Sequence, residues 1–202
     1  MSCLENRDYV VLIDKSGSMV GTDTPTGQTR FKYAEESTIA LAKKLETLDP
    51  DGITLIPFAG QFKVYDNVTA AQVANVFHEN EPMGGTVLAA PLKRVFSDFL
   101  ALKSSGRMKE NGMICVVVTD GEPQDGPEVA AAIVDFTKKL DNGDDEFGLL
   151  FFQVGKDHQA TKYLQMLDDN LKGAKFDIVD TKTFDEIENI GVLAALEASL
   201  DD

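Results

Sequence analysis

Residues 8–19 read DYVVLIDKSGSM, and this stretch decides the fold. Its first part, residues 8–13, is a short apolar run of the kind that forms a strand buried inside a sheet. The run ends at Asp14, and residues 15–29 are then rich in glycine, serine, threonine and aspartate, which indicates a loop. A buried strand followed by a polar loop predicts a ligand site at the carboxyl end of a parallel sheet.

A second run of this kind lies at residues 112–119 (GMICVVVT) and ends at Asp120. Its β-branched residues predict a central strand that is buried on both faces. Further strands are predicted at residues 52–58, 62–69, 147–154 and 176–179. Only about three residues link the strands at 52–58 and 62–69. These two strands therefore form a hairpin, and one of them runs antiparallel to the rest of the sheet.

Between the strands, apolar residues recur at helical spacing. The predicted helices cover residues 31–48, 70–77, 88–102, 127–140, 159–171 and 184–200. Asp49-Pro50 is expected to end the first helix, and Pro91 to delay the regular part of the third. The alternation predicts an α/β fold: a Rossmann-like, doubly wound, mostly parallel sheet of about six strands with helices on both faces. Because residues 1–202 contain no repeat and no long linker, a single domain is expected.

Charge and composition narrow the classes of partner. The chain carries 34 acidic and 19 basic residues, a net charge of −15. Such a surface repels nucleic acid and anionic membranes and attracts cations and basic partners, although acidity can also simply keep a protein soluble. Cys3 and Cys115 are expected to be unpaired. We find no signal peptide and no apolar run of about 18 residues, so a cytoplasmic location is expected.

The loops after the two central strands are rich in oxygen groups. The first loop presents Asp14, Ser16 and Ser18 at alternate positions, and Gly17 allows a tight turn between the serines. Carboxylate and hydroxyl oxygens suit hard cations, and no thiolate or imidazole is present to favour zinc or copper. Each loop alone has a structural explanation, since Thr86 would be a helix cap and Asp120-Gly121 a turn. Their joint occurrence on neighbouring strands favours a metal site.

Three segments resemble the metal-ion-dependent adhesion site of von Willebrand A domains: Asp-x-Ser-x-Ser at residues 14–18, Gly84-Gly85-Thr86, and Thr119-Asp120-Gly121. The resemblance extends over about residues 7–200. It implies that Ser16 and Ser18 bind a divalent cation directly, Mg²⁺ before Mn²⁺ or Ca²⁺, and that Thr86 binds it directly or through water. Asp14 and Asp120 would anchor the site through waters and hydrogen bonds. An Asp or Glu of a partner protein would fill the remaining coordination position.

The chain also resembles stand-alone intracellular von Willebrand A proteins of bacteria and phages. This resemblance implies a non-enzymatic, metal-dependent protein-binding module in a multi-protein assembly, such as one built around an AAA+ ATPase or a stress-response system. The alternative is a metal-dependent phosphoester hydrolase, since Mg²⁺ can polarise a phosphoryl oxygen. The motif loops offer no histidine as a general base, and Lys15 is their only basic side chain. A third possibility is a metal site that is structural or unused.

Two further features lie close to the predicted site. The segment from Val20 to Arg30 is longer than the usual link in the family and is expected on the rim of the site. It either shapes the choice of partner or is a tolerated surface insertion. Glu122 and Asp125 are expected to flank the site as solvated side chains.

Overall fold

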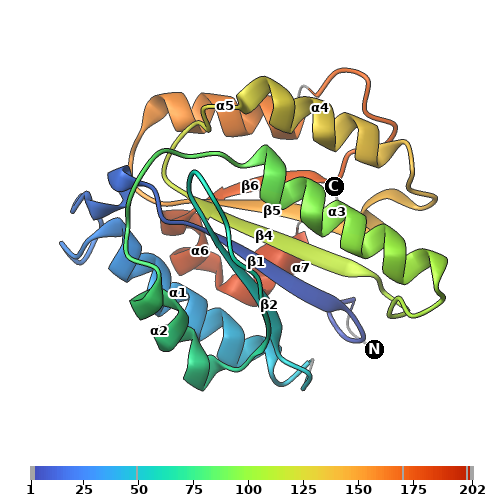
Figure 1. The fold of residues 1–202 in the computed structure, drawn as a ribbon, viewed down its shortest axis with the longest axis horizontal. Coiled ribbons are helices and arrows are strands. Elements are labelled where there is room, and N and C mark those ends of the chain that lie inside the picture. Colours follow the sequence, from blue (N-terminus) through green and yellow to red (C-terminus); the bar gives the residue numbers. More distant parts are fainter. Residues whose placement is uncertain (1–2, 49, 170, 199, 201–202) are drawn as a thin grey trace.

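The computed structural model describes residues 3–48, 50–169, 171–198 and 200. Its centre is a six-stranded sheet with the order β3-β2-β1-β4-β5-β6 (Figure 1). Neighbouring strands are parallel except for the antiparallel pair β2–β3. This sheet confirms the predicted fold class. The strands are β1 (Asp8–Asp14), β2 (Ile53–Phe58), β3 (Tyr65–Val68), β4 (Met113–Thr119), β5 (Phe147–Gln153) and β6 (Val179–Thr183).

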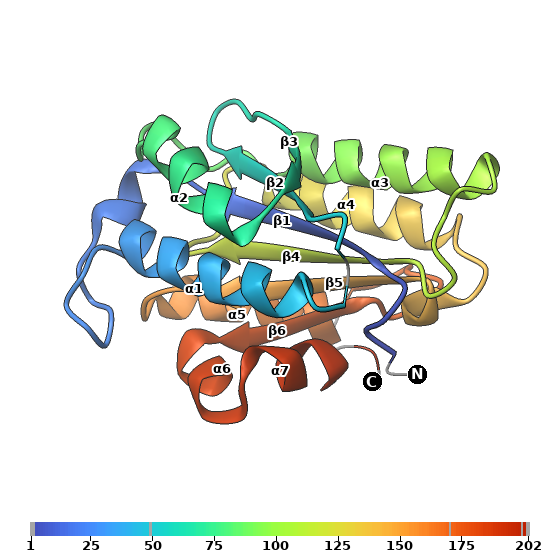
Figure 2. The same ribbon diagram turned by 90° about the horizontal axis from the view of Figure 1, so that it is seen from below.

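Helices cover both faces of the sheet (Figures 1 and 2). One face carries α1 (Arg30–Leu45), α2 (Ala70–Glu79), α6 (Phe184–Ile190) and α7 (Val192–Ala198). The other carries α3 (Ala89–Ser104), α4 (Gly126–Thr137) and α5 (His158–Asp169). The short 3₁₀ helices are η1 (Gly17–Val20) and η2 (Gly143–Asp145). Because successive strand residues point to opposite faces, Val11 and Ile13 join one core while Val10 and Leu12 join the other.

A cluster of phenylalanines fixes α3 and α4 on the sheet. The rings of Phe96 and Phe136 are stacked with their centroids 4.0 Å apart. Phe99 and Phe147 meet edge to face at 5.1 Å. Such ring pairs add directional contacts to the burial of apolar surface. Since α3 begins shortly after Thr86 and α4 shortly after Asp120, this packing also positions the loops that carry these two residues.

Several boundaries differ from the sequence-based expectation. The last strand lies at Val179–Thr183 rather than at residues 176–179, because this edge strand is mostly polar and lacks an apolar signature. The terminal helix predicted at 184–200 is two helices, separated at Gly191, whose φ of 87° an α-helix does not allow. The strand predicted at 62–69 is shorter, Tyr65–Val68. The predicted helix stop at Asp49 lies outside the described residues, and α1 ends at Leu45.

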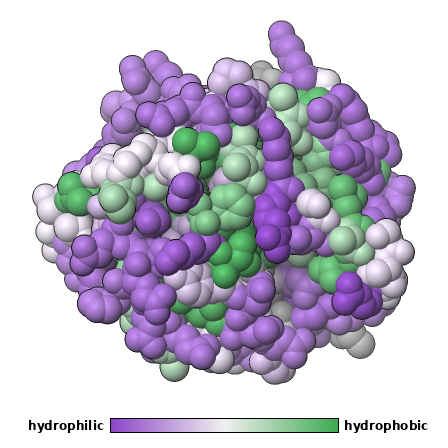
Figure 3. Space-filling model, in the orientation of Figure 1, coloured by the Kyte–Doolittle hydropathy of each residue, from purple (hydrophilic) through white to green (hydrophobic). Residues whose placement is uncertain are grey.

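Both cysteines are free, as predicted: Cys3 is exposed, and Cys115 is buried in β4. Complete burial raises the pKa of the Cys115 thiol. Among the described residues, no helix is long and apolar enough to cross a membrane. Figure 3 shows hydrophilic side chains over much of one face of the molecule, with apolar side chains gathered in patches near its middle and toward the right of the view.

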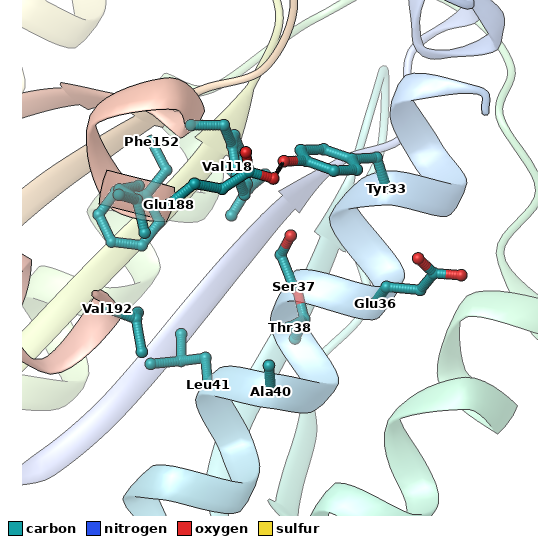
Figure 4. A pocket seen from close by; sticks show the side chains of 12 residues that line it. Tyr33, Glu36, Ser37, Thr38, Ala40, Leu41, Val118, Phe152, Glu188 and Val192 are labelled. Atoms are coloured by element: carbon teal, nitrogen blue, oxygen red, sulfur yellow. Dashed lines mark hydrogen bonds between the residues drawn. The ribbon is translucent and has the colours of Figure 1, made fainter. Parts of the chain in front are cut away.

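A cavity of about 340 Å³ lies between α1 and the terminal helices α6 and α7 (Figure 4). Its walls are mostly apolar and include Leu41, Phe152 and Val192. At its edge the Tyr33 hydroxyl donates a hydrogen bond to Glu188 of α6, which ties the two helices together. Burial and the neighbouring carboxylate both raise the pKa of Tyr33. The terminal helices are therefore fastened to α1 by this polar contact as well as by packing.

Candidate metal centre

The predicted site residues lie at the carboxyl ends of β1 and β4. These strands are parallel neighbours, with Ile13 paired to Val118, so Asp14 and Thr119 end side by side. From β1 the chain continues into α1 on one face of the sheet, and from β4 into α4 on the other. Strand order thus reverses between β1 and β4, which is where open α/β sheets bind ligands.

Asp14 is completely buried and fully engaged in hydrogen bonds. Its Oδ1 accepts a hydrogen bond from the Ser16 amide at 2.7 Å, and its Oδ2 accepts one from the Thr119 hydroxyl at 2.7 Å. Burial raises the pKa of Asp14 to about 6, although these hydrogen bonds favour the ionised form. Asp14 therefore anchors the loop after β1 to the end of β4.

The two serines connect this loop to Asp120. The Ser16 and Ser18 hydroxyls lie 3.0 Å apart, and Ser18 donates to Oδ1 of Asp120 at 2.9 Å. Asp120 is 1% exposed. A hydroxyl that donates its proton to a carboxylate keeps its oxygen lone pairs for other partners, such as a cation. The arrangement thus places two hydroxyl oxygens together in front of a buried negative charge.

Backbone hydrogen bonds bring the Thr86 loop to the same place. The Gly17 amide donates to the Gly84 carbonyl at 2.9 Å, and the Gln124 amide donates to the Thr86 carbonyl at 2.9 Å. Gly84 has a φ of 79°, which favours glycine at this turn. Thr86 is nearly buried, and its hydroxyl makes no hydrogen bond within the part of the chain that the structure describes. All five predicted residues therefore lie on three loops that contact one another.

Sequence reasoning missed Arg30, which lies directly behind Asp120. Its Nη1 donates to Oδ2 of Asp120 at 2.7 Å, while its Nε and Nη2 donate to the two oxygens of Asp23 at 2.6 and 2.8 Å. The hydrogen bonds from Arg30 lower the pKa of Asp23 to about 2, and the pairing with Asp23 raises the pKa of Arg30. No spacing rule links these three positions, so the sequence carries no signal for the contact.

Asp125 is not the solvated side chain that was expected. Its carboxylate accepts hydrogen bonds from the amides of Leu88 and Ala89, at 3.0 and 2.8 Å, at the start of α3. The carboxylate satisfies backbone donors that the first turn of a helix leaves unpaired. Asp125 thereby ties the loop after β4 to the helix that follows Thr86. Glu122 is exposed, as expected.

The chemistry of these residues fits a hard divalent cation. Among the described residues no three His, Cys, Asp or Glu side chains are grouped to hold a metal. The candidate centre instead combines two carboxylates with three hydroxyls, so every potential ligand is an oxygen. Mg²⁺ and Mn²⁺ accept such ligands together with water.

The fold and the position of these loops define an open α/β domain with an oxygen-rich site at the switch point of its sheet. The chain belongs to the von Willebrand factor type A domain family, whose model matches residues 9–122. This range spans all five candidate ligands. No curated protein sequence matches the chain significantly.

Solved structures share the fold at low sequence identity. The PilB minor pilin from Streptococcus sanguinis has a TM-score of 0.68 at 13% identity; the match covers 98% of this chain and 62% of that chain. BatB from Bacteroides thetaiotaomicron has a TM-score of 0.58 at 18% identity, covering 95% and 97%. Manganese-loaded TRAP protein from Plasmodium vivax has a TM-score of 0.64 at 12% identity, covering 98% and 74%. The chain thus spans less than two thirds of the PilB structure.

Proposed function

We propose that this chain is a non-enzymatic protein-binding domain that works through a divalent cation. Asp14, Ser16, Ser18, Thr86 and Asp120 would hold the cation, Mg²⁺ before Mn²⁺ or Ca²⁺, and an Asp or Glu of a partner protein would complete its coordination. The observation that carries the proposal is the hydrogen bond from Ser18 to buried Asp120, because it leaves hydroxyl lone pairs for a cation. The manganese-loaded state of the related TRAP structure supports it.

The surroundings of the two carboxylates explain why a partner carboxylate would bind. Asp14 and Asp120 already accept hydrogen bonds from the protein at both of their oxygens. A cation held mainly by neutral hydroxyls and water keeps a strong attraction for an additional anionic ligand. Since the chain carries a net charge of −15, we expect the partner's carboxylate to lie on a neutral or basic surface.

We place this activity in a cytoplasmic multi-protein assembly, such as an AAA+ ATPase complex or a stress-response system. This part of the proposal rests on resemblance to stand-alone bacterial and phage members of the family. The alternative of a phosphoester hydrolase gains no support from the site. Arg30, the basic side chain beside Asp120, is already bound by two carboxylates.

Isothermal titration with Mg²⁺ and Mn²⁺ tests the metal site. We expect the wild-type domain to bind one ion and a Ser16→Ala/Ser18→Ala variant to bind at least about 10-fold more weakly, since it loses two ligands. Ser104→Ala, which removes an exposed hydroxyl on α3, is the matched control and should bind as wild type. No heat and no thermal stabilisation of the wild-type domain in millimolar metal would refute the proposal.

Affinity capture tests the partner. The domain should retain a protein from its native lysate in Mg²⁺ but not in EDTA, and Asp14→Ala should abolish retention. A partner retained equally in EDTA would show that binding does not depend on the metal.

A further inference from the structure

The rim segment, residues 20–29, is connected to the candidate metal centre through one side chain. Arg30 follows this segment as the first residue of α1, and its side chain is only 17% exposed. The planar guanidinium bridges Asp23, within the rim segment, and Asp120, at the end of β4. Asp23 in turn accepts a hydrogen bond from the Lys156 amide at 3.3 Å. Three loops therefore meet at a single arginine.

Two glycines make room for the Arg30 side chain. A Cβ added to Gly155 would lie 2.6 Å from Nε of Arg30, and one added to Gly21 would lie 3.1 Å from the same atom. Real side chains do not approach as closely as 2.6 Å, and 3.1 Å is tighter than most contacts, so the guanidinium occupies a slot that requires a glycine at 155 and is narrow at Gly21. A slot of this kind, closed by three short hydrogen bonds, holds the side chain in one orientation.

This orientation has a consequence for the metal ligands. Arg30 engages Oδ2 of Asp120, which fixes the plane of the carboxylate and leaves Oδ1 for Ser18. The Ser18 hydroxyl must then direct its proton toward Asp120 and its lone pairs away from it. Arg30 thus orients a ligand that it does not touch. Neighbours of this kind commonly tune metal affinity by about 10- to 100-fold.

We propose that Arg30 is a positioning residue that couples metal binding to the closure of the rim segment. The inference rests on the proposed function, because it requires a cation at Ser16 and Ser18. Binding free energies are reciprocal: if a closed rim segment strengthens metal binding, the metal must strengthen rim closure by the same factor. The rim segment is then neither a passive insertion nor an independent loop, since its order depends on the metal.

The test compares two variants with the wild-type domain by Mn²⁺ titration calorimetry. Arg30→Lys keeps the positive charge but cannot bridge both carboxylates with a planar fork, so it isolates positioning from charge. We expect it to bind Mn²⁺ about 10-fold more weakly. Asp23→Asn leaves the contact between Arg30 and Asp120 in place but loosens the rim segment and removes a negative charge, and it should also weaken binding. Arg94→Lys, in an exposed ion pair with Asp98 on α3, is the matched control.

Hydrogen exchange of the amides in residues 21–29 supplies the second readout. In EDTA these amides should exchange faster in Arg30→Lys and Asp23→Asn than in wild type. Mn²⁺ should slow their exchange in wild type but not in Arg30→Lys. Mn²⁺ affinity of Arg30→Lys equal to that of wild type, or rim amides in wild type that do not respond to Mn²⁺, would overturn the inference alone. A wild-type domain that binds no Mn²⁺ would instead overturn the proposed function, and the coupling with it.

Discussion

Asp14→Asn should stabilise the metal-free domain at neutral pH. The substitution keeps the shape of the side chain, and its oxygen can still accept the Ser16 amide. The Thr119 hydroxyl can accept a hydrogen bond from the new amide group, because it can donate its own proton to the Gly121 carbonyl, 3.3 Å away. What disappears is a buried negative charge. Burial raises the pKa of Asp14 from 3.8 to about 6, which corresponds to about 3 kcal/mol at neutral pH.

The sign of the pH dependence follows from this raised pKa. The unfolded chain ionises Asp14 near pH 3.8, whereas the folded domain resists ionisation until about pH 6. Asp14 therefore does not lower the free energy of unfolding below pH 3.8, where it is protonated in both states. This free energy falls as the pH rises from 3.8 to about 6. Wild type and Asp14→Asn should be similarly stable at pH 4, and the variant should be more stable at pH 8 by about 3 kcal/mol.

Urea denaturation in EDTA at pH 4, 6 and 8 measures the free energy of unfolding of both proteins. The difference between the two values cancels the contributions of the other titrating groups. The melting temperature of the variant at pH 8 should be higher by about 6–12 °C for a domain of this size. Millimolar Mg²⁺ should stabilise wild type and leave the variant unchanged, because a ligand stabilises only the state that binds it. A variant that is less stable than wild type in EDTA at pH 8 would refute the reasoning.

Three further substitutions test the packing around the sheet by urea denaturation. Lys103→Met should cost about 3 kcal/mol, because it leaves the buried Glu146 carboxylate without its ion pair at 2.8 Å; Lys103→Arg, which keeps the charge, should cost less. Gly112→Ala should cost at least about 3 kcal/mol, because its Cβ would lie 1.9 Å from the Glu146 carbonyl oxygen, and wild-type stability would contradict the close approach. Tyr33→Phe should cost about 1 kcal/mol and speed hydrogen exchange in α6, since it removes the hydrogen bond to Glu188; unchanged exchange would rule out that tie.

The central part of the fold could be predicted because its signals are local. β1 and β4 are nearly continuous apolar runs, with Asp14 as the last residue of β1 and Asp120 directly after β4. Both the strands and the aspartates at their carboxyl ends are therefore visible in the sequence. The edge of the sheet was harder to predict. β6 reads VDTKT, and a partly exposed edge strand needs no apolar pattern. The break at Gly191 was also missed, since an isolated glycine does not always end a helix.

The candidate site also contains residues that the sequence could predict and contacts that it could not. Asp14, Ser16 and Ser18 lie within five residues of sequence, so their spacing alone indicates convergence. Arg30 and Asp120 are 90 positions apart, and Asp125 reaches an amide 36 positions away. Contacts of this range depend on how the helices pack, and short sequence patterns do not encode them. The five candidate residues could thus be named from local pattern and family resemblance, whereas the contacts of Arg30 and Asp125 with their loops required the structure.

The pairing of β1 with β4 also dictates when the site can form during synthesis. Asp14 and Thr119 are 105 positions apart, so the ribosome must add more than a hundred residues after Asp14 before its carboxylate meets the Thr119 hydroxyl. At typical elongation rates this interval lasts roughly 5 to 20 s, during which β1 has no central neighbour on that side. A cation at the proposed site would therefore find its ligands together only after residue 120 has been made. Such a cation should slow unfolding of the assembled domain and leave the first stages of folding unchanged.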